Sequence, residues 1–436
     1  MAAPSQTGFN PSATPTGARH VTTMFAVLLA VVMYIDRITL SQAAPYIRAD
    51  LNLSTKEMAW AFSMFGWAYA LFEIPGGWLG DRIGPRRVLM RIVIWWSFFT
   101  AATGLVFNQF SLVITQTLFG VGEAGAFPNM TRIFTTWLPK KERERAQATL
   151  WLASRWGGAL TPLLVIYLLR YLHVSWRVVF MLFGSIGVIW AIAFYRWFRD
   201  DPSTHPGVNA AELALLPPRS ETRQAHTFPF RQLVANRNVV LLCLQYACLA
   251  YGWWFYVTWL PTYLRDARQT TLQLHPMVLA LLTGLPLLMG GVGCLIAGRL
   301  GPRLAESMGS VIKARRVMAI TGFLGASASI FVFTRVFDPI QAMFVLGMAG
   351  FFNDFIMPSA WAGAMDIGGR YAGTVSGAMN MVGGIAGASS SLFVGYLLAW
   401  TNQNWTMALY ISATIYSLGA VAWLFLDSHT PMDQGD

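Results

Sequence analysis

Charged side chains are scarce in this sequence. They make up 12% of its 436 residues, whereas 55% of the residues are hydrophobic. Soluble domains carry roughly 25% charged residues, so this chain has too few charges to cover a water-exposed globular surface. In a bilayer, lipid replaces water around most of the chain, and the composition therefore predicts a membrane protein.

Cysteine and histidine are also few. Cys243, Cys248 and Cys294 all lie in apolar runs, which is typical of small core residues and not of a disulfide framework. The six histidines are scattered, mostly in loops or tails, and we find neither a metal-binding spacing nor a nucleophile–base set. We therefore predict that the protein is not an enzyme and needs no cofactor or metal.

Long apolar runs, by contrast, are frequent. Twelve are long enough for helices that cross a bilayer, which takes about 20 residues each. They are residues 21–46, 59–80, 89–108, 111–138, 146–171, 176–198, 235–264, 277–300, 314–336, 340–366, 372–400 and 405–426. We predict an all-α membrane protein with six-helix bundles at 21–198 and 235–427. A linker at 199–234 joins them, and tails lie at 1–20 and 428–436. We expect the first tail to be disordered and not a cleaved signal peptide, because no basic region precedes the first apolar run.

Lysine and arginine are distributed unevenly between the loops. With the N-terminus in the cytoplasm, 21 of them fall on the cytoplasmic side and 7 on the outer side. Cytoplasmic loops carry such an excess, so we expect both termini in the cytoplasm and the chain in the inner (plasma) membrane. A nucleic-acid-binding protein would gather its charge on one soluble face. The net charge of +11 therefore predicts no nucleic-acid partner.

The two halves of the sequence repeat each other. The run GDRIGPR at 80–86 corresponds to GRLGPR at 298–303, and the Gly-rich stretches at 120–128 and 155–158 correspond to those at 347–358 and 381–384. Three matches in register indicate an internal duplication. A six-plus-six repeat predicts a ligand site between the halves, near the middle of the bilayer.

The segment GWLGDRIGPRR at 77–87 resembles the loop motif of the major facilitator superfamily. Its glycines permit a tight turn, and Asp81 can face a helix N-terminus or a nearby arginine. The resemblance implies a conformational latch; the alternative is a solvated charged turn. The expected gating loop comprises Gly77, Asp81, Arg82, Gly84, Arg86 and Arg87.

Four further stretches narrow the resemblance. They are YIDR at 34–37, GEAGAFP at 122–128, WLPTYL at 259–264, and Trp361 with Asp366. Together they resemble the anion:cation symporter family, which includes bacterial galactonate, hexuronate and glucarate importers and the animal sialic-acid and vesicular glutamate transporters. The resemblance covers nearly the whole chain. It implies proton-coupled symport of a small organic anion, such as a sugar acid, by alternating access, and we expect a monomer.

Asp36 and Glu123 are acids deep inside predicted spans. Asp36 lies about fifteen residues into its helix, or roughly 22 Å from the inner end at 1.5 Å per residue. An ionised carboxylate at this depth costs several kcal/mol unless it is paired or hydrated, and binding a proton removes that cost. We predict proton coupling, which the resemblance also implies for both positions. The alternative is a static ion pair between Asp36 and Arg37.

Arg37 is our candidate for binding the anion, because a guanidinium group fits a carboxylate in a planar, two-bonded arrangement. The resemblance implies that Tyr34, Tyr69, Trp361 and Asn380 also contact the substrate, although the tyrosines could equally be packing residues. The repeat makes Ser154 the mirror of Asn380, and we therefore add Ser154 to the expected site.

One position departs from the family pattern. Members usually carry an arginine seven residues before the acid of span four, and this chain has Gln116 there, which we also predict to bind the substrate. We hypothesise that Arg155 in span five replaces it; the alternatives are a contact with the end of span four or an extension toward the interface. We also expect the polar pair Asn353 and Asp354 to face the cavity from the second half.

The missing arginine leaves other functions open. An aromatic or dicarboxylic acid is a possible substrate, as is an exchanger or uniporter mechanism in which Asp36 and Glu123 are structural. A non-transporting sensor is a further alternative, although the linker is too short for a signalling domain.

Overall fold

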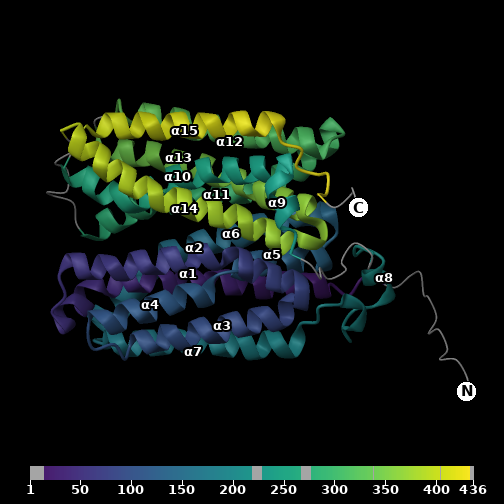
Figure 1. Cartoon of the computed structure of the whole chain (residues 1–436), viewed down its shortest axis with the longest axis horizontal. Coiled ribbons are helices and arrows are strands. Elements are labelled where there is room, and N and C mark those ends of the chain that lie inside the picture. The colour runs from purple at the N-terminus through teal and green to yellow at the C-terminus, as the bar shows by residue number, and fades with distance from the viewer. Residues whose placement is uncertain (1–13, 219–227, 267–275, 337, 403, 433–436) are drawn as a thin grey trace, which may run out of the picture.

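The computed structural model describes residues 14–218, 228–266, 276–336, 338–402 and 404–432 (Figure 1). Long helices lie side by side in two bundles, α1–α7 in one and α10–α15 in the other. The first bundle contains α1 (Ala18–Leu51), α2 (Thr55–Ile83), α3 (Pro85–Thr103), α4 (Gln109–Glu123), α5 (Ala126–Trp137), α6 (Lys140–Ile166) with a π-helical turn at Tyr167–Tyr171, and α7 (Trp176–Trp197). The second contains α10 (Arg237–Asp266), α11 (Pro276–Met308), α12 (Val311–Phe333), α13 (Pro339–Gly368), α14 (Ala372–Trp400) and α15 (Trp405–Phe425).

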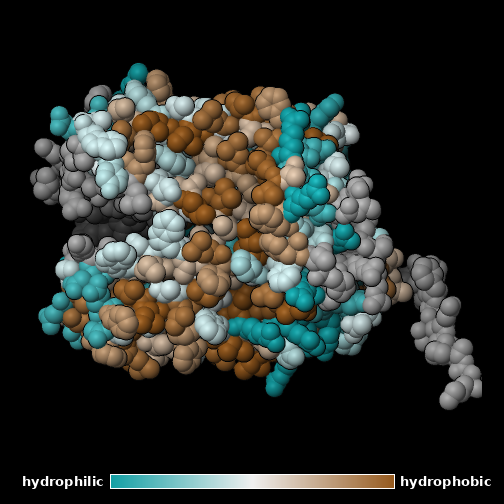
Figure 2. Space-filling model, in the orientation of Figure 1, coloured by the Kyte–Doolittle hydropathy of each residue, from teal (hydrophilic) through white to brown (hydrophobic). Residues whose placement is uncertain are grey.

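Eleven of the twelve predicted spans correspond to one long helix each, which in the fifth span ends in the π-helical turn. Among the described residues, eight helical stretches have the length and hydropathy needed to cross a membrane. Figure 2 shows hydrophobic side chains over the middle of the visible face and hydrophilic side chains toward its ends. This distribution suits a bundle whose long axis crosses a bilayer.

The predicted span 111–138 is not one helix but two. α4 ends at Glu123, and Gly125 adopts φ 83° before α5 begins at Ala126. Glycine is suited to this left-handed conformation because it has no Cβ. The bend also brings the backbone close to α2, since a Cβ on Gly125 would lie 2.6 Å from the Cα of Gly76. The corresponding helix of the second half, α13, runs unbroken.

Two equivalent pairs of helices make the largest contacts between the bundles. α2 packs against α14, and α6 packs against α11. These are spans two with eleven and five with eight, so the contacts follow the six-plus-six repeat of the sequence. Both ends of the described chain and the linker lie at one end of the molecule (Figure 1), which we call the terminal face.

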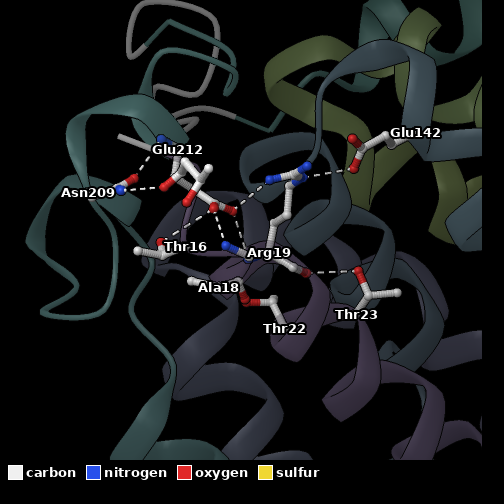
Figure 3. A network of polar contacts seen from close by, with 10 residues as sticks. Thr16, Ala18, Arg19, Thr22, Thr23, Glu142, Asn209 and Glu212 are labelled. Atoms are coloured by element: carbon white, nitrogen blue, oxygen red, sulfur yellow. Dashed lines mark hydrogen bonds and ion pairs between the residues drawn. The ribbon is translucent and has the colours of Figure 1, made fainter. Parts of the chain in front are cut away.

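The linker lies across the start of α1. It contains a 3₁₀ turn at Pro202–Thr204, α8 (Ala210–Leu213) and α9 (Phe230–Ala235). The carboxylate of Glu212 accepts hydrogen bonds from the Thr16 hydroxyl, from the backbone N–H groups of Gly17 and Arg19, and from the Arg19 guanidinium (Figure 3). Arg19 also pairs with Glu142 at the start of α6, with Nε and Oε2 3.0 Å apart.

The prediction of disorder at 1–20 is therefore wrong for its last residues. Residues 14–17 are held by the linker and residues 18–20 are helical, because Glu212 supplies acceptors for the free N–H groups at the start of α1. Residues 1–13 lie outside the described part. The second tail also packs, since the Met432 N–H donates to the carbonyl of Ile367.

Candidate functional site

A cavity of about 190 Å³ lies between the two bundles. Five of the predicted substrate-binding residues line it: Tyr34, Arg37, Tyr69, Arg155 and Asn380. They come from α1, α2, α6 and α14, so both halves of the chain contribute to the wall. Tryptophans Trp151, Trp253 and Trp254 add apolar surface. A small cavity with cations and hydrogen-bond donors beside aromatic rings suits a small organic anion.

Arg37 binds Glu123 at the edge of this cavity. The Nε of Arg37 lies 2.8 Å from Oε2 of Glu123, and the Glu123 side chain is fully buried. Glu123 is the last residue of α4, and the C-terminal end of a helix disfavours a negative charge. Arg37 compensates for that charge. Its Nη2 and the Oε1 of Glu123 have no hydrogen-bond partner among the described residues, so the pair can accept another ligand or a proton.

Asp36 lies behind the cavity wall. The residue is only 3% exposed, and neither carboxylate oxygen has a hydrogen-bond partner within the described ranges. No ion pair joins Asp36 to Arg37, which binds Glu123 instead. The predicted alternative of a static Asp36–Arg37 pair therefore does not describe this conformation. A buried carboxylate without an ion-pair partner is costly when charged.

Arg155 joins the two bundles across the cavity. Its Nε and Nη2 lie 2.6 and 2.9 Å from the two carboxylate oxygens of Asp354 on α13. Its Nη1 donates to the hydroxyl of Tyr34 at 2.9 Å. The guanidinium carbon lies 3.9 Å from the centre of the Trp253 ring. Arg155 thus neither contacts the end of span four nor extends to the interface. Asn353 and Asp354 do not themselves line the cavity, and Asp354 contacts it only through Arg155.

Comparison with known proteins agrees with this architecture. The family model of the Major Facilitator Superfamily matches residues 26–391. The chain belongs to this superfamily. Members of the superfamily are membrane transporters, so this chain is a multi-pass membrane transporter and not an enzyme.

Curated relatives cover nearly the whole chain. A probable sulfoacetate transporter of Cupriavidus necator is 35% identical over 96% of both chains. The D-galactonate transporter of Escherichia coli is 30% identical over 95% of this chain and 97% of its own length. A probable galactarate/D-glucarate transporter of Bacillus subtilis is 29% identical over 90% of this chain and 89% of its own.

Three predicted contact residues of the transporter lie outside the cavity lining. The Gln116 amide donates to the Thr103 hydroxyl between α4 and α3. The Ser154 hydroxyl donates to the carbonyl of Leu150 in its own helix. Trp361 is fully buried and packs against Trp151. None of the three lines the cavity in this conformation, and their contact with the substrate stays a prediction.

Glu73 is an acid of α2 that our sequence reasoning missed. It is fully buried, and its Oε1 accepts a hydrogen bond of 2.9 Å from the Asn380 amide of α14. Asn380 also donates to the hydroxyl of Tyr69, which lines the cavity. Acids are rare in spans, and that rule, which singled out Asp36 and Glu123, would have found Glu73 as well.

The expected gating loop lies at the terminal face. Asp81 accepts hydrogen bonds from the backbone N–H groups of Gly373 and Thr374 at the start of α14, at 3.0 and 2.6 Å. Its carboxylate also lies 3.6 Å from Nε of Arg132. Asp81 thus faces both a helix N-terminus and an arginine, the two partners anticipated from the sequence.

The rest of the loop follows the end of α2. Gly84 ends the helix with φ 90°, and Arg86 donates its N–H to Asp200. Arg82 stacks on Trp78, and Arg87 is exposed. The backbones of Gly77 in α2 and Gly373 in α14 are in close contact, so the two halves pack tightly at this point.

Proposed function

We propose that the protein is a proton-coupled symporter for a small organic anion and that it works by alternating access as a monomer in the inner membrane, with both termini in the cytoplasm. The arginine–acid pair formed by Arg37 and Glu123 at the cavity carries the proposal. The names of the relatives, which include sulfoacetate and sugar-acid transporters, support an organic anion as the substrate. The 21-to-7 distribution of lysine and arginine supports the orientation.

Coupling arises from competition for one guanidinium group. An anion that approaches Arg37 meets Glu123, which already occupies its Nε. Two carboxylates on one buried cation repel each other, so a proton on Glu123 favours binding of the anion. When the anion leaves on the other side, Glu123 releases its proton and pairs with Arg37 again. Asp36, a second buried acid of the first half, joins the same exchange in this proposal.

The structure supports one of the two states that alternating access requires. Two contacts between the halves close the terminal face. Asp81 accepts hydrogen bonds from the start of α14, and Nη1 of Arg143 lies 3.0 Å from Oδ1 of Asp366. Transport to the terminal side requires these contacts to break. The cavity lies deeper in the molecule, where anion and proton binding can shift the balance between the two states.

The Glu123→Gln substitution tests this function. Glutamine keeps the size and the hydrogen bond to Arg37 but cannot exchange a proton. In proteoliposomes we expect Glu123→Gln to abolish uptake driven by a pH gradient and to retain counterflow of the anion. Suitable substrates to screen first are sulfoacetate, galactonate and glucarate.

A matched control is Glu306→Gln, at an exposed position of α11. It should leave both activities unchanged. Gradient-driven uptake that survives in Glu123→Gln would refute coupling through this acid. It would favour the alternative of an exchanger or uniporter in which Asp36 and Glu123 are structural.

A further inference from the structure

Two arginines line the same cavity, and a different carboxylate binds each. Arg37 pairs with Glu123 inside the first half, whereas Arg155 pairs with Asp354 across the two halves. Both guanidinium carbons lie near the ring of Tyr34, at 5.8 and 5.9 Å from its centre. They are therefore no farther apart than the sum of these distances, and one small molecule can reach both cations.

The proposed function uses only the first of these pairs. Building on that function, we propose that the substrate is a small dianion with two carboxylate or sulfonate groups on a short carbon chain. One anionic group binds Arg37. The other displaces Asp354 from Arg155 and takes its place.

Arg155 is placed to accept a substitute for Asp354. Its side chain is 4% exposed, so its charge needs a counter-ion at all times. The Tyr34 hydroxyl and the Trp253 ring hold the guanidinium at the cavity wall independently of Asp354. An incoming anionic group therefore exchanges with the carboxylate instead of adding to it.

Asp354 keeps a partner when it is released. The Asn353 amide donates to its Oδ1 at 2.8 Å, and Asn353 is itself fixed by the hydroxyl of Tyr416 at 2.8 Å. The other oxygen, Oδ2, lies against Gly290 of α11, where a Cβ would come within 2.3 Å. Within its own half of the molecule, the carboxylate thus has a hydrogen-bond donor in Asn353 and room beside Gly290.

Displacement would also affect the conformation. The Arg155–Asp354 pair ties α6 of the first half to α13 of the second, next to the cavity. A dianion on both arginines removes this tie, whereas a monoanion on Arg37 leaves it in place. The second charge of the substrate thereby removes one ion pair between the halves, in addition to the contacts at the terminal face that transport must break.

Calorimetric titration of the purified protein with pairs of compounds that differ by one charge tests the inference. Succinate is compared with succinamate, sulfoacetate with sulfamoylacetate, and glucarate with its monoamide. We expect the dianion of each bound pair to bind on the order of ten- to a hundredfold more tightly, as for one charge-assisted contact. Equal affinity within every pair, or no binding of any of the three dianions, would overturn the proposal.

Two variants locate the preference. The double substitution Arg155→Gln with Asp354→Asn removes both charges and keeps polar side chains of similar size, so that it avoids a lone buried charge. Within each pair it should bind the dianion and the monoanion with equal affinity. The control Arg177→Gln removes an arginine from a partly exposed pair with Asp50, and the preference should persist.

A preference retained in the double variant would assign Arg155 a structural role only and overturn the proposal. These titrations need no proton gradient. Their failure is therefore distinguishable from failure of proton coupling, which the Glu123→Gln uptake assay reports.

Discussion

The Arg37 side chain has two features, its positive charge and the planar shape of its guanidinium group. It balances the charge of Glu123, and in the proposed function its Nη2, which has no hydrogen-bond partner among the described residues, binds the anion. Lysine would keep the charge but lose the planar group that binds a carboxylate through two N–H donors. We expect Arg37→Lys to weaken anion binding on the order of ten- to a hundredfold with little loss of thermal stability. Isothermal titration measures the first effect and a melting curve the second. Unchanged affinity would remove Arg37 from the binding site.

Some site residues could be predicted from sequence because rarity alone marks them. A charged residue deep in an apolar run is costly, so Asp36, Arg37, Glu123 and Arg155 stand out without any structure. Their partners do not. Which acid Arg155 binds depends on how α6 meets α13 across 199 residues of sequence. Gln116 is the opposite case, since it matches a family position but lies outside the cavity lining in this conformation.

Gly77 packs tightly against another element at the terminal face. A Cβ there would lie 2.2 Å from the carbonyl oxygen of Gly373, and a backbone atom in a helix cannot move aside cheaply. Overpacking of this kind costs about 1–3 kcal/mol. We expect Gly77→Ala to lower the population of the closed terminal face about tenfold or more. Distances between spin labels at exposed Lys141 and Lys313 would report a wider separation.

Gly284→Ala in α11 is the matched control for this substitution. A Cβ at Gly284 meets nothing within 4 Å, so the spin-label distances should not change. Identical distances in Gly77→Ala and wild type would show that the α2–α14 contact does not control closure.

The linker adds a pH-dependent contact outside the membrane. Burial alone would raise the pKa of Glu212, but hydrogen bonds from the backbone N–H groups of Arg19 and Gly17 and from the Arg19 guanidinium outweigh it and lower that pKa. The stabilisation is therefore complete above the ordinary carboxyl pKa of about 4.3 and is lost as the pH falls through the lowered value.

Melting temperatures at a series of pH values test this contact. Glu212→Gln should melt below wild type at neutral pH, and the difference should disappear in acid. Glu306→Gln, which changes an exposed glutamate, should show no such difference. A gap between Glu212→Gln and wild type that is the same at all pH values would contradict the role of the ionised carboxylate.

The positions of the long helices could be predicted from the sequence, but the places where a helix is interrupted could not. Apolar length marks a span because the bilayer thickness is fixed. The break after Glu123 depends on α2 passing close to Gly125, which is a tertiary contact. The hydrogen bonds between Glu212 and residues 16–19 could not be predicted for the same reason. They are tertiary contacts, since Glu212 lies nearly 200 residues away in the sequence.

At the scale of the whole molecule, the internal repeat accounts for the architecture. The duplication predicts two bundles with a site between them, and the paired contacts α2 with α14 and α6 with α11 follow from it. The same arrangement places the contacts of Asp81 with α14 at the terminal face and the Arg37–Glu123 pair at the cavity. In the proposed function, a change in protonation at the cavity alters how the two bundles fit together.

Simultaneous measurement of anion and proton flux in proteoliposomes tests the central claim most directly. With no initial pH gradient, an inward gradient of a transported anion should acidify the vesicle lumen, as reported by an entrapped pH-sensitive dye. Glu123→Gln should abolish the acidification. Anion entry at the wild-type rate with no change of internal pH would contradict proton-coupled transport by this protein.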